Sequence, residues 1–235
     1  MSAFDVFGEW FSQFASADWI ALGLYLSGLF GYRYFLAFML RNRPHSLFLG
    51  KLQEYRNAWI GAYSGGKEGI VVVQTLRNMI MSASFLASTA VILIMGALNL
   101  LPGLGATARV ADFAGASNDS LTGFKVLLII IILSYSFFKF TWYIREVNYM
   151  SVILNIAKDK LDEIEGGDST PDIARMFLTS GIHFSLGVRG YYFLVPLLMW
   201  FFSPILMSIA SVLIVYILIR RDLGPEVRLT GKQKG

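Results

Sequence analysis

Long apolar runs alternate with polar connectors along the chain, and this alternation predicts its elements. A membrane helix needs about 20 predominantly apolar residues to cross the hydrocarbon core, and four of the runs are about that long. A fifth, shorter run continues into Arg220. The pattern therefore predicts an all-α polytopic membrane helix bundle with about five spans, at residues 18–40, 79–101, 121–143, 182–202 and 205–220.

Two polar connectors, residues 44–68 and 145–181, keep apolar positions at helical spacing. With charges on the opposite face, this spacing indicates amphipathic helices at the membrane surface. In the second connector, Gly166-Gly167 predicts the end of one helix, and Thr170-Pro171 predicts the start of another with Thr170 as its cap. We expect both connectors to be cytoplasmic parts of a single membrane domain, residues 1–235.

Two topologies compete near the C-terminus. Residues 191–219 as a single span would be about 43 Å long at 1.5 Å per residue, against a hydrocarbon core of about 30 Å, and would give four spans. A hairpin that turns at Ser203-Pro204 gives five spans. Positive residues stay on the cytoplasmic side. With the acidic N-terminus outside, only the hairpin returns the basic residues after position 219 to that side, so we favour five spans.

The composition indicates that lipid rather than water surrounds the predicted helices, and it leaves the predicted helices themselves unchanged. The chain is 55% hydrophobic and only 15% charged, whereas soluble domains are about 25% charged, so lipid must solvate the apolar runs. There are no cysteines, which excludes disulfides and thiolate chemistry. The net charge is +4, and the cations lie beside apolar runs. This placement indicates membrane orientation rather than nucleic-acid binding.

Small residues and one arginine are notable in the first span. Gly23, Ser27 and Gly31 recur at every fourth position, which predicts a face for close packing against another helix. Arg33 lies about two turns before the basic end of this span, and the simplest interpretation is that its side chain reaches the headgroups.

The start of the second span carries the most suggestive polar group. Gln74, Arg77 and Asn78 share a helical face that continues into the membrane through Ser84 and Ser88. The functional interpretation is a site for an anion, a lipid headgroup or a solute. The alternative, structural interpretation is that the Arg77 side chain extends to the membrane–water interface, while the side-chain amides of Gln74 and Asn78 form hydrogen bonds that join helix ends.

Arg189 and His183 form the second candidate site. A buried arginine there would need a carboxylate, carbonyl groups or water. We expect no acid inside any span, and we expect acids such as Glu146 to form a solvated face of the cytoplasmic segment. His45 and His183 are the only histidines and have no metal-site spacing, so we expect no metal and no cofactor. No motif assembles a nucleophile with its base.

Four sequence motifs carry a family resemblance. They are VQTLRNMIMSASFLASTA at 73–90, GVRGYYFLVPLLMW at 187–200, YRNAW at 55–59 and RRD at 220–222. In these motifs the chain resembles the bacterial and plant membrane-protein family named domain of unknown function 599. The resemblance implies a polytopic membrane protein, and it implies no activity, ligand or catalytic residue.

These observations give ordered expectations for function. The first is a non-enzymatic scaffold or accessory protein of a bacterial inner membrane. Its basic site would bind an anionic lipid headgroup or a partner subunit. The alternative is a small-solute transporter or channel, and a membrane enzyme that modifies lipids ranks last. Under the alternative, the path would be lined by Gln74, Asn78, Ser84, Ser88 and Thr89.

Overall fold

The structure is a computed structural model that describes residues 14–42, 55, 58, 69–100 and 119–223. Every element in these ranges is a helix. The helices are α2 (Ser16–Asn42), α4 (Gly69–Leu98), α6 (Asp119–Ile153), α7 (Lys158–Glu165), α8 (Thr170–Met199) and α9 (Pro204–Asp222). The prediction of an all-α protein is confirmed. The predicted amphipathic helix at 44–68 lies outside the described residues, apart from Tyr55 and Ala58.

Five of the helices, all except α7, are long and apolar enough to cross a membrane. The two topologies proposed for the C-terminal region are distinguished by Ser203, whose extended backbone separates α8 from α9. Its hydroxyl accepts a hydrogen bond from the Ile205 amide at 3.2 Å, which caps α9 just before Pro204. The hairpin, and with it the prediction of five spans, is confirmed.

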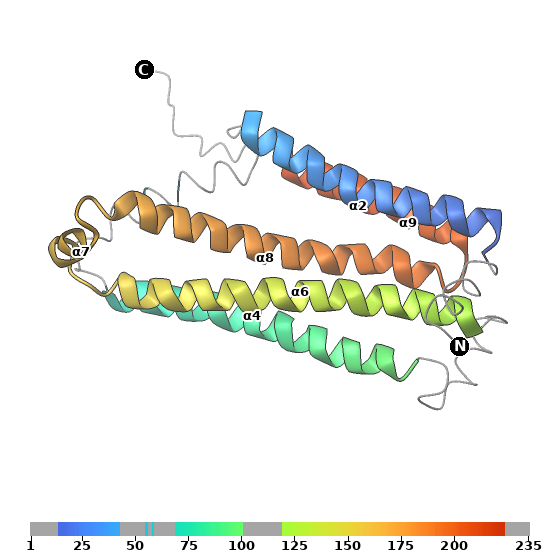
Figure 1. The fold of residues 1–235 in the computed structure, drawn as a ribbon, viewed down its shortest axis with the longest axis horizontal. Coiled ribbons are helices and arrows are strands. Elements are labelled where there is room, and N and C mark those ends of the chain that lie inside the picture. The colour runs from blue at the N-terminus through green and yellow to red at the C-terminus, as the bar shows by residue number, and fades with distance from the viewer. Residues whose placement is uncertain (1–13, 43–54, 56–57, 59–68, 101–118, 224–235) are drawn as a thin grey trace, which may run out of the picture.

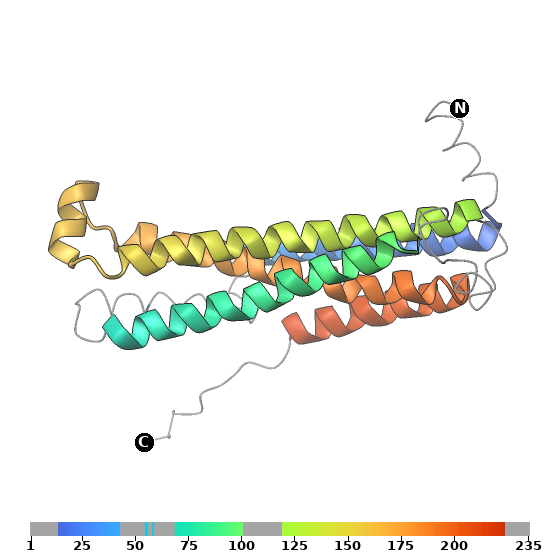
Figure 2. The ribbon, with the colours of Figure 1, turned by 90° about the horizontal axis from the view of Figure 1, so that it is seen from below.

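The helices pack in the order α4, α6, α8, α9, α2, in which each helix contacts the next. Figure 1 shows α2 and α9 together on one side of α8, with α6 and α4 on the other side. The first span therefore packs against the last one rather than against its neighbour in sequence. Figures 1 and 2 also show that α4, α6 and α8 extend beyond α2 and α9 at the end of the bundle that carries α7. We name this end the α7 end.

Two apolar clusters hold these contacts together. One joins α2, α6, α8 and α9 around residues such as Tyr25, Phe193 and Trp200, while the other joins α4, α6, α7 and α8 around Leu76 and Met150. Many large apolar side chains on the outside are exposed, with Phe85 at 70% and Ile92 at 70%. A soluble monomer rarely exposes so much apolar surface, whereas a lipid-solvated bundle does so along every span.

The helices continue past the predicted spans at the α7 end. α4 begins at Gly69 rather than near Met79, and α6 runs to Ile153. The segment 145–181 therefore consists of the end of α6, the short helix α7 and the start of α8. Gly166 ends α7 with φ of +72°, as its sequence predicted. The N-cap of α8 is Ser169 and not Thr170, which is the first helical residue.

Close helix contacts occur at glycines other than those predicted. A Cβ added to Gly23 or Gly31 would meet no atom within 4 Å, so this face of α2 does not pack against a described helix. A Cβ on Gly187 of α8 would lie 2.7 Å from the ring of Phe140 on α6, and that ring is fully buried. The closest approach therefore joins α8 to α6, the two helices that carry most of the polar groups described next.

Candidate functional site

Arg189 is buried in the middle of the bundle, with 5% of its surface exposed. Its Nη2 donates to Oδ2 of Asp222 at 3.0 Å, and the hydroxyl of Tyr32 donates to the same oxygen. The guanidinium carbon also lies 5.3 Å from the centroid of the Tyr32 ring. One polar contact thus joins α2, α8 and α9 inside an otherwise apolar seam.

The Asp222 carboxylate is the counter-charge that a buried arginine requires in lipid. Arg221 lies on its other side, with Nε 3.8 Å from Oδ1 of Asp222, and donates to the hydroxyl of Tyr192 at 3.0 Å. Asp222 and Asp18 are both buried at the ends of membrane helices. The expectation of no acid inside a span did not anticipate these two buried carboxylates at the ends of candidate spans.

A cavity of about 200 Å³ lies next to Arg189, between α2, α6 and α8. Most of its lining is apolar, and the lining comprises Leu29, Phe30, Tyr32, Arg33, Ile131, Ile132, Tyr135, Leu186, Arg189, Gly190 and Phe193. Phe30 and Ile131, on the two helices that border it, are 62% and 52% exposed. Because these residues belong to membrane-spanning helices, the cavity opens toward lipid. We name it the α2–α6 groove.

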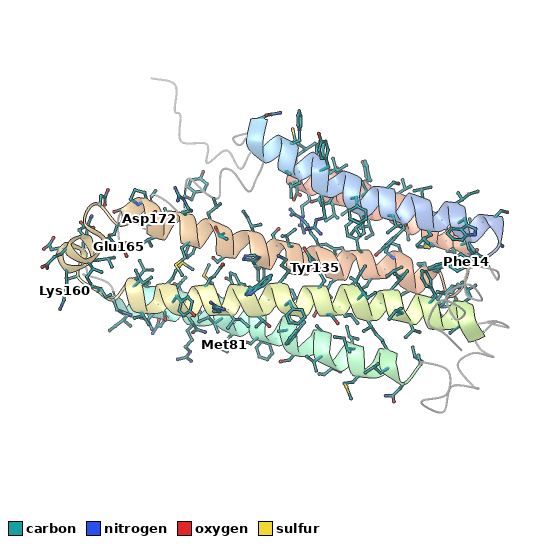
Figure 3. The ribbon with its side chains drawn as sticks, viewed as in Figure 1. Phe14, Met81, Tyr135, Lys160, Glu165 and Asp172 are labelled. Carbon is teal, nitrogen blue, oxygen red and sulfur yellow. The ribbon has the colours of Figure 1, made fainter. Side chains whose placement is uncertain are left out.

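Two buried donors in the lining of the α2–α6 groove have no hydrogen-bond partner among the described residues. They are the hydroxyl of Tyr135 and Nε of Arg189. Figure 3 labels Tyr135 midway along α6. The guanidinium carbon of Arg33 lies 5.4 Å from the centroid of the Tyr135 ring, and Nζ of Lys139 lies 5.6 Å from it. Buried donors are normally paired, so these two point to a group that accepts hydrogen bonds in the groove.

A second polar cluster lies between α6 and α8, closer to the α7 end. Nζ of Lys139 is 3.4 Å from Nδ1 of His183, and Nε2 of His183 is 3.6 Å from Oε1 of Glu146. The ring of Trp142 lies against the imidazole, with 5.6 Å between the centroids. The side chain of Glu146 is only 24% exposed, so the prediction that it belongs to a solvated face is wrong. It faces the histidine instead.

A third polar contact closes the opposite end of the bundle. Oδ1 of Asp18 accepts a hydrogen bond from the Trp200 indole at 2.7 Å, and Lys125 donates to the Trp200 carbonyl at 2.9 Å. All three side chains are buried. These contacts join α2, α6 and α8, and they have a structural role because each group is already engaged.

The structure separates the residues that the sequence singled out. Gln74, Arg77 and Asn78 are exposed on α4, whose buried face points to α6. Within the described residues, no hydrogen bond or ion pair joins them to Arg189 or His183. Arg189 instead meets α2 and α9, while His183 meets α6. Anion binding by the α4 residues thus remains a prediction.

The proposed path residues also lie on α4. Ser84 and Thr89 donate their hydroxyls to the carbonyls one turn earlier, at 2.9 and 2.8 Å, and Ser88 is exposed. A path lined by these side chains would run along the surface of the described bundle. Its existence stays a prediction.

Sequence reasoning missed Tyr32 and Tyr135 because a tyrosine in a span usually marks an interface or packing. Asp222 appeared only within the terminal RRD motif of the family resemblance. The stated need of Arg189 for a carboxylate was the one signal that could have led to it. Among the described residues, no group of three or more histidines and acids could hold a metal ion.

The five apolar helices and the polar contacts buried between them define a polytopic membrane protein of the helical-bundle class. Within this class, the chain belongs to the family described as "Protein of unknown function, DUF599", whose model matches residues 20–226. The resemblance stated from the sequence is thereby confirmed. No curated protein and no solved structure matches the chain.

Proposed function

We propose that this protein is a non-enzymatic membrane accessory protein that binds an anionic phospholipid in the α2–α6 groove. The headgroup phosphate would accept hydrogen bonds from Tyr135 and Arg189, with Arg33 beside it. The observation that carries the proposal is the pair of buried, unpartnered donors, Tyr135 Oη and Arg189 Nε, in the lining of one cavity. A phosphate oxygen is a strong acceptor for both donors.

The charges around the groove support an anionic ligand. Arg189 is neutralised by Asp222, but none of the ion pairs among the described residues includes Arg33. The ammonium of Lys139 adds a further positive charge near the Tyr135 ring. An anion in the groove would therefore supply a counter-charge to Arg33, which has none among the described residues.

The size and depth of the groove support a bilayer lipid as the source of that anion. Arg33 lies about 22 Å along the axis from Asp18, within snorkelling distance of the far surface of a core about 30 Å thick. The cavity of about 200 Å³ is somewhat larger than the apolar cavity of about 150 Å³ that holds a benzene. It suits one segment of an acyl chain, with the rest of the lipid in the bilayer.

The test compares lipid binding to the purified protein in detergent micelles, measured by native mass spectrometry. Phosphatidylglycerol and phosphatidylcholine of equal chain length differ in the net charge of the headgroup and share the phosphate and the chain contacts. Arg33→Gln should weaken phosphatidylglycerol binding about 10-fold or more, since a hydrogen bond to a charged group contributes about 1.5–3 kcal/mol. Tyr135→Phe should weaken the binding of both lipids, because both carry the phosphate that accepts its hydrogen bond, whereas Arg33→Gln should affect phosphatidylglycerol more strongly, because only that lipid has a net negative charge.

Arg77→Gln is the matched control, because Arg77 is exposed on α4 and receives the same substitution. It should leave phosphatidylglycerol binding intact. If Arg77→Gln weakens binding and Arg33→Gln does not, the site lies on α4 and the proposal for the groove is wrong. Inorganic phosphate is added in parallel, and competition by free phosphate at the lipid's concentration would contradict a lipid-specific site.

A further inference from the structure

Lys139 lies between the α2–α6 groove and the cluster at His183. Its ammonium is 5.6 Å from the centroid of the Tyr135 ring on the groove side and 3.4 Å from Nδ1 of His183 on the other side. We propose that His183 takes up a proton when an anion binds in the groove, with Lys139 as the residue that couples the two events. This inference rests on the proposed function and assigns its regulation.

The observed contacts select one form of His183. A lysine ammonium has only donors, so Nδ1 of His183 must be the acceptor and the ring proton must be on Nε2. That proton faces Oε1 of Glu146 at 3.6 Å. The other carboxylate oxygen of Glu146 is buried without a hydrogen-bond partner in the described chain. A neutral histidine thus separates an ammonium from a carboxylate.

A proton added to Nδ1 would change these contacts. It would remove the acceptor of Lys139 and place two cations 3.4 Å apart. Glu146 would stabilise the imidazolium, because it already faces Nε2. Lys139 would have to turn away, and its remaining neighbours are the rings of Tyr135 and Trp142, at 5.6 and 5.0 Å. A shift toward Tyr135 would increase the positive charge beside the groove.

The other charges that act on this cluster are few. Arg33 of α2 repels Lys139, and Arg145 of α6 attracts Glu146. Within the described residues, α8 and α4 add no ion pair to His183. An anion beside Arg33 would weaken the repulsion on Lys139 and make room for it near the groove. Anion binding would therefore favour the protonated histidine, and by linkage the protonated histidine would favour the anion.

The ion pairs at α7 do not titrate in the range where a histidine does, near pH 6.5. Hydrogen bonds from Lys158 and Thr170 lower the pKa of Asp168 to about 2. Hydrogen bonds to Asp162 and Asp168 raise the pKa of Lys158 above its ordinary value. The stabilisation by Asp168 is lost only as the pH falls toward about 2, and that by Lys158 only at alkaline pH. A change between pH 5 and 8 thus has another origin.

The experiment measures the affinity for phosphatidylglycerol between pH 5 and 8 with the full chain in phosphatidylcholine nanodiscs that contain a series of phosphatidylglycerol fractions. In the wild-type protein the affinity should rise 5-fold or more from pH 8 to pH 5, the lower range of typical allosteric coupling. His183→Gln should keep the wild-type affinity at pH 8 and show no rise. His45→Gln, at the other histidine of the chain, should behave like the wild type.

A second measurement follows the proton directly. Trp142 lies against His183, so an imidazolium will quench its emission, and Trp142→Phe identifies its share of the signal. Adding phosphatidylglycerol should move the midpoint of this titration to higher pH, by about 0.7 units for 5-fold coupling. Lys139→Gln is measured in discs of the same lipid content, so both proteins experience the same surface potential. In this variant the shift should be abolished.

The outcomes separate the two proposals. If the wild-type protein binds phosphatidylglycerol through Arg33 but its titration midpoint does not move, or moves equally in Lys139→Gln, the coupling is wrong and the proposed function stands. If Arg33→Gln binds as well as the wild type at every pH, the proposed function is wrong. Should His183→Gln fail to fold, the emission of the wild type and Lys139→Gln still decides the matter.

Discussion

At the scale of single residues, the buried Arg189–Asp222 pair is a costly polar feature of the spans. Two charges lose their hydration in the seam between α8 and α9, and their attraction must offset this loss. The Tyr32 hydroxyl satisfies the same carboxylate oxygen. The pair leaves Nε of Arg189 without a partner among the described residues, and the same residue lines the groove.

Asp222→Asn should therefore lower the free energy of unfolding by about 3–5 kcal/mol, because it leaves the charge of Arg189 buried without a partner. Denaturant unfolding in detergent micelles, followed by tryptophan emission, measures this loss. The double variant Arg189→Gln/Asp222→Asn should recover part of it, since no charge is then left alone.

Arg221→Gln is the control for this series. Arg221 also approaches Asp222, at 3.8 Å, but its side chain is 48% exposed. An exposed ion pair contributes about 0–1 kcal/mol, so this variant should unfold almost like the wild type. Equal losses in Arg221→Gln and Asp222→Asn would show that burial of the pair does not determine its contribution.

Residue chemistry in this bundle was only partly predictable from the sequence. That Arg189 needs a carboxylate follows from the cost of a bare cation in lipid. That the carboxylate belongs to Asp222 depends on how α8 and α9 align, which no local pattern encodes. The prediction for Glu146 is wrong for a related reason, because the sequence pattern places the start of the polar segment where α6 continues as helix to Ile153.

At the scale of the helices, the apolar pattern predicted which elements exist better than which faces meet. The hairpin at Ser203-Pro204 was predictable because charge placement required it. The packing faces were not. The regular spacing of Gly23, Ser27 and Gly31 looks like an interface, yet the closest contacts are made by Gly187 and Gly190 of α8, which lack such spacing. A glycine allows close helix packing where a large side chain of another helix lies against it, and only the tertiary structure defines which side chain that is.

Gly187→Ala should destabilise the contact between α6 and α8 by about 1–3 kcal/mol, the usual effect of overpacking. The added Cβ would lie 2.7 Å from the fully buried ring of Phe140, which has little room to move. Gly23→Ala is the matched control, because its Cβ would meet nothing within 4 Å. The melting temperature in detergent measures both. Equal melting temperatures would contradict the close contact.

At the scale of the whole molecule, the helix order α4, α6, α8, α9, α2 could not be read from the chain. Sequential spans are expected to be neighbours, and α4, α6, α8 and α9 follow this rule, but α2 packs against α9 rather than against α4. As a consequence, α2 and α6 do not pack closely against each other. The α2–α6 groove lies between them, and α8 supplies the rest of its lining. The groove thus depends on an arrangement of helices that the sequence did not predict.

The orientation in the membrane is a prediction that the ends of the bundle make testable. Figure 3 labels Lys160 on α7, at the opposite end from Phe14. The chain has no native cysteine, so a single one can be introduced without background. If basic segments are cytoplasmic, Ser16→Cys should react with a membrane-impermeant maleimide in intact cells. Lys160→Cys should react only after permeabilisation, and labelling of Lys160→Cys in intact cells would reverse the orientation.

The Arg189–Asp222 contact also sets an order for biogenesis. The two residues are 33 positions apart, and Tyr32 is 190 positions before Asp222. While α8 is being synthesised, its cation has no counter-ion, because the residue that supplies it has not yet been translated. The contact that holds α2 against α9 can form only after residue 222 has been synthesised. A nascent chain that stops before residue 222 therefore lacks the group that allows its helices to close.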